Sequence, residues 1–256
     1  MNLRLGDLLA TYTPEKRRAE KLELWTYLVV RPLSWVPALL FLKAGISANT
    51  VTWLSILAAI AGSALVAFGS AAAALAGTAF LLLWAVLDCA DGTVARFSKT
   101  SGNRGEFLDA LGGYAMNALV FPAAGVFGWR GAVGLLAAGG NGAAGQAAAA
   151  GLDPVWAGGV WPLVAGFLAA ESGLAARLLY QKYRNLAGEG ARELKPKGGG
   201  NLLVAAAQNL VSVTGLLVPF LVLALLFGAT GLFVTLYAAV NIAMLLFSLF
   251  KILKDV

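Results

Sequence analysis

Long apolar stretches separated by short polar segments dominate the sequence. Six of them are about twenty residues long, which is the length of helix needed to cross ~30 Å of hydrocarbon. They occupy residues 50–69, 72–95, 106–127, 157–181, 202–227 and 230–252. The pattern predicts an all-α integral membrane protein with six transmembrane helices.

The first 48 residues follow a different pattern, which predicts a helix lying in the membrane interface. Residues 1–24 are polar and do not resemble a signal peptide. Their basic cluster, which favours contact with anionic lipid, is Lys16, Arg17, Arg18 and Lys21. Residues 24–43 are apolar but interrupted by Arg31-Pro32, by Pro37 and by aromatic residues, as is typical of interfacial helices. The stretch is also long enough to span the membrane, so that alternative stays open.

We expect a single membrane domain over residues 1–256, with a cytoplasmic or interfacial segment at 1–48 and a six-helix transmembrane bundle at 49–256. The segment 128–156 is rich in Gly and Ala, and its weak hydropathy fits a loop, a re-entrant piece or a poor helix. With six crossings, eighteen of the nineteen Lys and Arg residues fall on one side, and Arg130 lies opposite. The positive-inside rule then places both termini and the 96–104 loop in the cytoplasm.

Composition agrees with a membrane protein and narrows the chemistry. The chain is 59% hydrophobic and 12% charged, whereas charged residues make up about a quarter of ordinary soluble domains. It has no histidine, which excludes histidine-based catalysis and ligation within this chain, and its one cysteine, Cys89, excludes an intramolecular disulfide. Carboxylates must therefore carry any acid, base and metal chemistry. Because the net charge of +6 follows the membrane topology, we expect no nucleic acid partner.

The candidate chemistry gathers in residues 87–113, LDCADGTVARFSKTSGNRGEFLDALGG. Asp88 and Asp91 are three residues apart, so a helix places both carboxylates on one face. Asp109 follows a short polar turn, on a second helix. Three carboxylates at two helix ends suit a hard divalent cation, Mg²⁺ or Mn²⁺, which takes oxygen ligands and substrate phosphates. The stretch predicts phosphate chemistry at a membrane face.

The same stretch resembles the signature of the CDP-alcohol phosphotransferase family. The matching positions are Asp88, Asp91, Gly92, Ala95, Arg96, Gly105 and Asp109. The resemblance implies a homodimer in which Asp88, Asp91 and Asp109 bind the metal. It also implies that a cytidine base packs in the room left by Gly92 and Ala95.

Other positions are assigned to the nucleotide site by the same resemblance. Asn49 and Thr52 form an Asn-x-x-Thr element that opens the first membrane helix, near the diphosphate. Arg96 is the basic residue of the motif and is expected to pair with phosphate, and Gly105 is a further motif position.

The family pattern ends in a fourth aspartate, and this sequence has Gly113 there. In the family that aspartate is a metal ligand and the base that deprotonates the acceptor alcohol. One substitute is Asp109 itself, or a metal-bound hydroxide. A second is Glu171, an acid in the middle of a predicted span, which alternatively pairs with a span residue such as Asn117, Gln208 or Asn241. The last possibility is that no base exists.

The leading interpretation is an enzyme of phospholipid or related lipid biosynthesis, in a bacterial or archaeal cytoplasmic membrane. It transfers a substituted phosphate from a CDP-activated donor, CDP-diacylglycerol or a CDP-alcohol, to an alcohol acceptor and releases CMP. The alternative is a homologue that binds nucleotide and metal without turnover. A transporter is a third interpretation, with slight support from Glu171 and from prolines within the spans.

Overall fold

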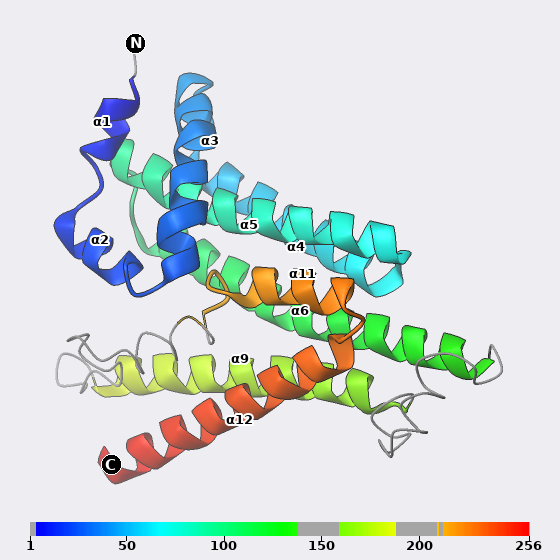
Figure 1. Ribbon diagram of the computed structural model, residues 1–256. Coiled ribbons are helices and arrows are strands. Elements are labelled where there is room, and N and C mark those ends of the chain that lie inside the picture. The colour runs from blue at the N-terminus through cyan, green and yellow to red at the C-terminus, as the bar shows by residue number, and fades with distance from the viewer. Residues whose placement is uncertain (1–3, 138–158, 188–208, 210–211, 256) are drawn as a thin grey trace. The chain divides into compact units, whose positions relative to one another are not determined.

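The computed structural model describes residues 4–137, 159–187, 209 and 212–255, and every regular element in those residues is a helix (Figure 1). Within this part of the chain, five helices are long and apolar enough to cross a membrane. They are α4 (Ala48–Phe68), α5 (Ala71–Phe97), α6 (Asn103–Ala137), α9 (Trp161–Ala187) and α12 (Thr230–Asp255). The predicted all-α, multi-pass membrane architecture is confirmed.

The sixth predicted span, 202–227, is represented by a shorter helix. Helix α11 (Leu217–Leu226) has ten residues, and a turn at residues 213–216 precedes it. Ten residues make about 15 Å of helix, half the hydrocarbon thickness. Residues 202–208 and 210–211 lie outside the described residues, so the count of six spans stays a prediction. Residues 128–137 continue helix α6, and the rest of the ambiguous segment 128–156 is likewise outside the described residues.

The N-terminal segment forms helices α1 (Leu5–Leu9) and α2 (Pro14–Glu20), a π-helix (Thr26–Val30) and helix α3 (Arg31–Lys43). The π-helix has a local cause. Pro32 lacks an N–H, and its ring would press on the carbonyl of Leu28 in a regular helix. The wider π turn, in which the Arg31 N–H bonds the Thr26 carbonyl, accommodates the proline. The interfacial position of this segment stays a prediction.

Helix ends close to the acidic stretch are fixed by specific caps. The Ser47 hydroxyl accepts a hydrogen bond from the Thr50 N–H at 3.2 Å and so caps the start of α4. Gly45, two residues after the last residue of α3, has a φ of +68° in the left-handed region. Lys99 holds the same position after α5, with φ of +53°.

The chain divides into two compact units, and α4, α5 and α6 each contribute to both. The first unit comprises Met1–Gly62, Ala76–Met116 and Gly198–Pro219. The second comprises Ser63–Leu75, Asn117–Lys197 and Phe220–Val256. All three motif aspartates belong to the first unit. The single membrane domain predicted for residues 1–256 stays a prediction.

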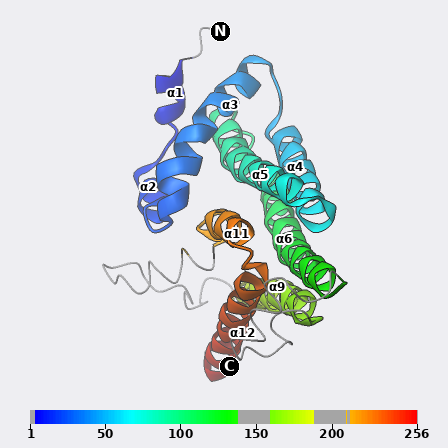
Figure 2. The same cartoon turned by 45° about the vertical axis from the view of Figure 1, so that its right-hand side comes forward.

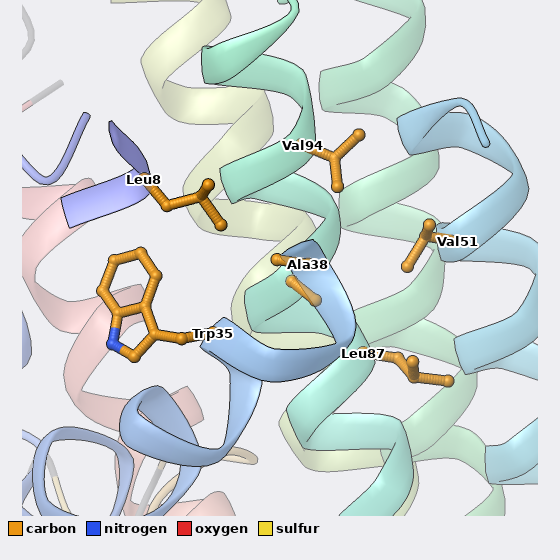
Figure 3. Close-up of a cluster of buried hydrophobic side chains, with 7 residues drawn as sticks. Leu8, Trp35, Ala38, Val51, Leu87 and Val94 are labelled. Carbon is orange, nitrogen blue, oxygen red and sulfur yellow. The ribbon is translucent and has the colours of Figure 1, made fainter. Parts of the chain in front are cut away.

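The core of the first unit surrounds the part of α5 that bears the acidic motif (Figure 3). Its buried residues come from α1, α3, α4 and α5, and they are Leu8, Trp35, Ala38, Val51, Leu87, Ala90 and Val94. Near the end of the unit, a Cβ at Gly62 would lie 2.8 Å from the Gly77 carbonyl oxygen, so α4 and α5 approach closely there. Burial of these apolar side chains holds the N-terminal helices against α5.

In the second unit, α9 packs along α12 (Figures 1 and 2). Helix α6 meets α9 at two glycines, because a Cβ at Gly125 would lie 3.2 Å from the Gly166 Cα. Arg130 donates hydrogen bonds to the carbonyls of Ala67 and Gly69, at 2.8 and 3.2 Å, and so caps the end of α4. In the predicted topology Arg130 is the one basic residue on the non-cytoplasmic side, and this contact explains its presence there.

Candidate metal centre

Two helices bring the three motif aspartates together. Asp88 and Asp91 lie on α5 and Asp109 lies on α6, and one carboxylate oxygen of each lies within 4.8 Å of the others. Ligand oxygens on opposite sides of a Mg²⁺ are about 4.2 Å apart, since each Mg–O distance is about 2.1 Å. Small side-chain adjustments would therefore place all three oxygens around one ion. The hard oxygen donors fit a divalent cation, and no imidazole or thiolate belongs to the cluster.

The three carboxylates differ in their exposure. Asp91 is buried with 4% of its surface exposed, Asp88 is half-buried and Asp109 is exposed. The cluster therefore has a buried side at Asp91 and an open side at Asp109, from which a substrate can approach. Across from Asp88, a Cβ at Gly112 would lie 3.9 Å from Asp88 Oδ1, so this face of α6 leaves room beside the acids.

Thr52 on α4 holds the buried carboxylate. Its hydroxyl donates a hydrogen bond of 2.6 Å to Asp91 Oδ2, and its oxygen also lies 3.1 Å from the Ala48 carbonyl. A hydroxyl has one proton, so the shorter contact to the charged acceptor is the main bond. Asn49 is half-buried one turn before Thr52, on the same face of α4.

The guanidinium of Arg96 lies beside Gly92. A Cβ at Gly92 would be 3.2 Å from Arg96 Nη1, so glycine provides the space in which this side chain folds back along α5. Nη2 of Arg96 donates to the Thr93 hydroxyl at 3.4 Å, and its buried Nε has no hydrogen-bond partner in the described residues. The ion pairs found in that part of the chain do not include Arg96. Its donors therefore suit an anionic group such as phosphate.

The remaining positions that the sequence singled out near the acids lie on α5 and α6. Ala95 is half-buried on α5, and Gly105 stands on the first turn of α6 with open space around its Cα. Gly113 is half-buried on α6.

Glu171 belongs to the second unit and is exposed on α9. Asn241, one of its predicted partners, donates instead to the Ala169 carbonyl at 2.9 Å. The side-chain oxygen of Asn117, another predicted partner, is buried and has no hydrogen-bond partner in the described residues. Gln208 lies outside the described residues.

A buried ion pair next to the acids was not predicted from the sequence. Arg31 donates from Nε to Glu20 Oε2 at 2.9 Å and from Nη2 to Oε1, and its Nη1 bonds the Cys89 carbonyl at 2.9 Å and the Thr93 hydroxyl at 3.3 Å. Tyr12 completes the set by donating to Glu20 at 2.6 Å. The one sequence signal was an arginine before proline in an apolar run, which we interpreted as a helix interruption.

Charge and burial act in opposite directions on this group. Burial by itself raises the pKa of Glu20, but the hydrogen bonds and charge of Arg31 outweigh it, so the pKa is lowered from its ordinary value. Burial, and then the hydrogen bond to Glu20, raise the pKa of Tyr12. Tyr12 therefore stays a neutral donor and Glu20 a charged acceptor near neutral pH.

Residues distant in sequence also bind the N-terminal segment. The side chain of Asn209 donates to the Leu22 carbonyl at 2.6 Å and accepts from the Leu24 N–H at 2.7 Å. Nearby, Thr214 donates to Glu23 at 2.9 Å. The link between α2 and the π-helix is thus bound to the chain just before α11.

These features define a multi-pass helical membrane protein with a carboxylate cluster suited to a divalent metal and an adjacent guanidinium suited to phosphate. Residues 45–149 match the family model described as CDP-alcohol phosphatidyltransferase, so this part of the chain is a domain of that family. The family consists of divalent-metal-dependent transferases. The matched range contains the three clustered aspartates and Arg96, whereas Glu20 and Arg31 precede it. A comparison with curated proteins gives no match.

Proposed function

We propose that this protein transfers a substituted phosphate group from a CDP-activated donor to an alcohol and releases CMP, with Mg²⁺ or Mn²⁺ held by Asp88, Asp91 and Asp109. The observation that carries the proposal is the convergence of these three carboxylates, from two helices, within 4.8 Å beside Arg96. A divalent cation bound there would neutralise charge on the diphosphate.

In the reaction a bond forms between the acceptor oxygen and the donor phosphorus, and the bond from that phosphorus to CMP breaks. Thr52 keeps the Asp91 carboxylate oriented by its hydrogen bond. The free donors of Arg96 pair with phosphate oxygens. Because a neutral hydroxyl is a weak nucleophile, a base must take its proton as the new bond forms. Asp109 is our first candidate, because it is the exposed member of the cluster.

Glu171 is the second candidate for the base. It is an exposed carboxylate on α9, and we propose that it accepts the proton if Asp109 does not. Asn49, Ala95 and Gly105 are proposed to line the nucleotide site, as the family motif implies.

The wider biological setting is also part of the proposal. The donor is either CDP-diacylglycerol with a soluble alcohol or a CDP-alcohol with a lipid acceptor. The one-sided distribution of Lys and Arg supports an active site facing the cytoplasm. We further propose a homodimer, in a bacterial or archaeal membrane, acting in phospholipid or related lipid synthesis.

A second candidate function is nucleotide and metal binding without turnover. Gly113 favours it, because glycine cannot accept a proton from the alcohol. The three clustered aspartates would then serve binding alone.

The test uses the full chain in detergent. Binding of CDP and of CDP-linked donors is titrated with and without Mg²⁺ or Mn²⁺, and CMP release is assayed with a panel of lipid and polar alcohols. Asp91→Asn should abolish metal-dependent binding, whereas Glu106→Gln, which changes an exposed acid of α6 outside the cluster, should not. Binding with CMP release supports the transferase. Binding without CMP release across the panel favours the second function, and absence of binding contradicts both.

A further inference from the structure

We propose that Arg31 is a positioning residue for the metal centre: paired with Glu20, it fixes the turn of α5 that carries Asp91 and, through Thr93, the guanidinium of Arg96. The inference rests on the function proposed for that site. Arg31 and Glu20 lie before the range matched by the family model, in helices that precede the first long apolar helix.

The Arg31 guanidinium has little freedom. It is 4% exposed, and Nε, Nη1 and Nη2 all donate to described acceptors. Its central carbon also lies 5.6 Å from the Tyr12 ring centroid and 5.7 Å from that of Trp35. A planar, doubly paired guanidinium packed beside two rings keeps one orientation.

The groups that Arg31 bonds on α5 lie on either side of a proposed metal ligand. Cys89 is two residues before Asp91 and Thr93 is two residues after it, and Nη1 of Arg31 bonds both the Cys89 carbonyl and the Thr93 hydroxyl. A donor from outside the helix thus holds one turn of α5 at two points. Since Thr52 holds the Asp91 carboxylate from α4, the backbone and the side chain at this position are fixed from different helices.

Thr93 extends the contact to Arg96. Its hydroxyl donates to the Cys89 carbonyl at 3.1 Å and accepts from Arg31 at 3.3 Å and from Arg96 at 3.4 Å. One proton and two lone pairs are all that a hydroxyl offers, so the hydrogen-bonding capacity of Thr93 is complete. The Arg96 guanidinium is therefore oriented through a residue that Arg31 itself fixes.

The segment that carries Arg31 is anchored independently of α5. Asn209 bonds the backbone at Leu22 and Leu24, just before the π-helix that leads into Arg31. Buried ion pairs often contribute little net stability compared with apolar residues of similar size. The Glu20–Arg31 pair is fully hydrogen-bonded and lies on an anchored segment, although its burial costs free energy. Orientation of the proposed metal centre explains it better than stability alone.

The experiment compares three variants with the wild type in detergent. Arg31→Lys keeps the charge but removes the fork that reaches Glu20 and α5 together. Thr93→Val keeps the volume and removes the contact to Arg96. Arg18→Lys is the matched control, because Arg18 is exposed on α2. Cys89, the one cysteine and 7% exposed, reports folding, since its alkylation stays slow while α5 remains packed.

The decisive readouts are the affinity and stoichiometry of Mn²⁺ binding, followed by electron paramagnetic resonance, and kcat and KM for CMP release. Folded molecules are counted by their protected Cys89. Per folded molecule, Arg31→Lys should bind as many Mn²⁺ ions as the wild type but about tenfold more weakly, as expected for loss of a group that orients a ligand. Thr93→Val should raise the donor KM about threefold, the effect of one modest hydrogen bond. Arg18→Lys should match the wild type in both.

A merely structural Arg31 would lower the stoichiometry and the protected fraction of Cys89 while leaving the affinity of the folded molecules unchanged. That result, or wild-type Mn²⁺ affinity in folded Arg31→Lys, overturns the inference. If the wild type binds Mn²⁺ but releases no CMP, the transferase proposal fails and Mn²⁺ affinity alone decides the role of Arg31. A wild type that binds no Mn²⁺ overturns both.

Discussion

The Thr52 hydroxyl on α4 lies 2.6 Å from Asp91 Oδ2 on α5, and both residues are almost completely buried. The two residues are 39 positions apart in the sequence, and the contact joins the Asn-x-x-Thr element to the acidic motif. The prediction that Thr52 lies near the diphosphate stays a prediction, and the structure shows its contact with Asp91, a proposed metal ligand. Orientation of Asp91 is a role that the sequence did not predict for this threonine.

Replacement of Thr52 by valine should weaken metal binding while preserving the fold. Valine keeps the volume and β-branching of threonine but cannot donate to Asp91, so we expect about tenfold weaker Mn²⁺ affinity. Thr52→Ser retains the hydroxyl and should stay within about threefold of the wild type. Titration of Mn²⁺ measures both, and equal affinities for Thr52→Val and the wild type would show that the hydrogen bond is dispensable.

Gly113→Asp introduces the residue that the resemblance to the family implies at this position. Aspartate is also the better helix former, by a few tenths of a kcal/mol, so the exchange should not destabilise α6. If the missing base limits turnover, CMP release should rise at least about a hundredfold, the range of general-base catalysis. The matched control is Gly131→Asp, at an exposed glycine of the same helix with open space around it. An unchanged rate would mean that another group already accepts the proton.

The pH dependence of stability should reveal the Glu20–Arg31 pair. The pKa of Glu20 is lowered in the folded protein from its ordinary value of 4.5, so the pair stabilises the fold fully above that value. The stabilisation is lost as pH falls from there through the folded pKa, because protonation removes the charge that Arg31, Lys16 and Tyr12 face. Thermal unfolding from pH 7 downwards should therefore show a steeper loss for the wild type than for Glu20→Gln. Parallel curves would contradict the assignment.

The sequence predicted what depends on local pattern. Hydropathy located five long helices to within a few residues at most ends, and the spacing of Asp88 and Asp91 placed them correctly on one face. The serine cap of α4 was also predictable, since capping is a short-range interaction. Helix α6 was the main exception, because it continues ten residues beyond its predicted end at 127. Its Gly- and Ala-rich end has weak hydropathy but still forms helix.

What the sequence did not predict depends on contacts between distant segments. Arg31 and Glu20 are eleven residues apart, well beyond the three or four residues that bring side chains together on one helix. The groups that Arg31 bonds on α5 are about sixty residues further on. Asn209 likewise acts on backbone groups some 185 residues away. Periodicity carries no information on such pairs. The left-handed residue that ends α5 was also missed, because it is lysine where glycine is usual.

The contact of α6 with α9 in the second unit should not tolerate a side chain. A Cβ at Gly166 would lie 2.5 Å from the Phe121 carbonyl oxygen, a backbone atom that cannot move aside without displacing the helix. Gly166→Val should lower the free energy of unfolding by about 1–3 kcal/mol, as overpacking does. Gly131→Ala, where the space is open, should cause no loss. Thermal unfolding in detergent measures both, and a stable Gly166→Val would mean that the helices separate readily.

The end of α5 offers a stabilising substitution next to the site. Lys99 has φ of +53°, and the Thr100 N–H bonds the Ala95 carbonyl at 3.0 Å, the hydrogen bond that closes this type of helix end. Gly45 and Gly228 occupy the equivalent positions after α3 and α11, with φ of +68° and +65°. A non-glycine residue in this conformation costs about 1 kcal/mol, so Lys99→Gly should stabilise the fold by about that amount. Lys99→Ala, which keeps a Cβ, is the control for loss of the charge. If both variants shift the unfolding temperature equally, removal of a basic side chain and not relief of backbone strain accounts for the change.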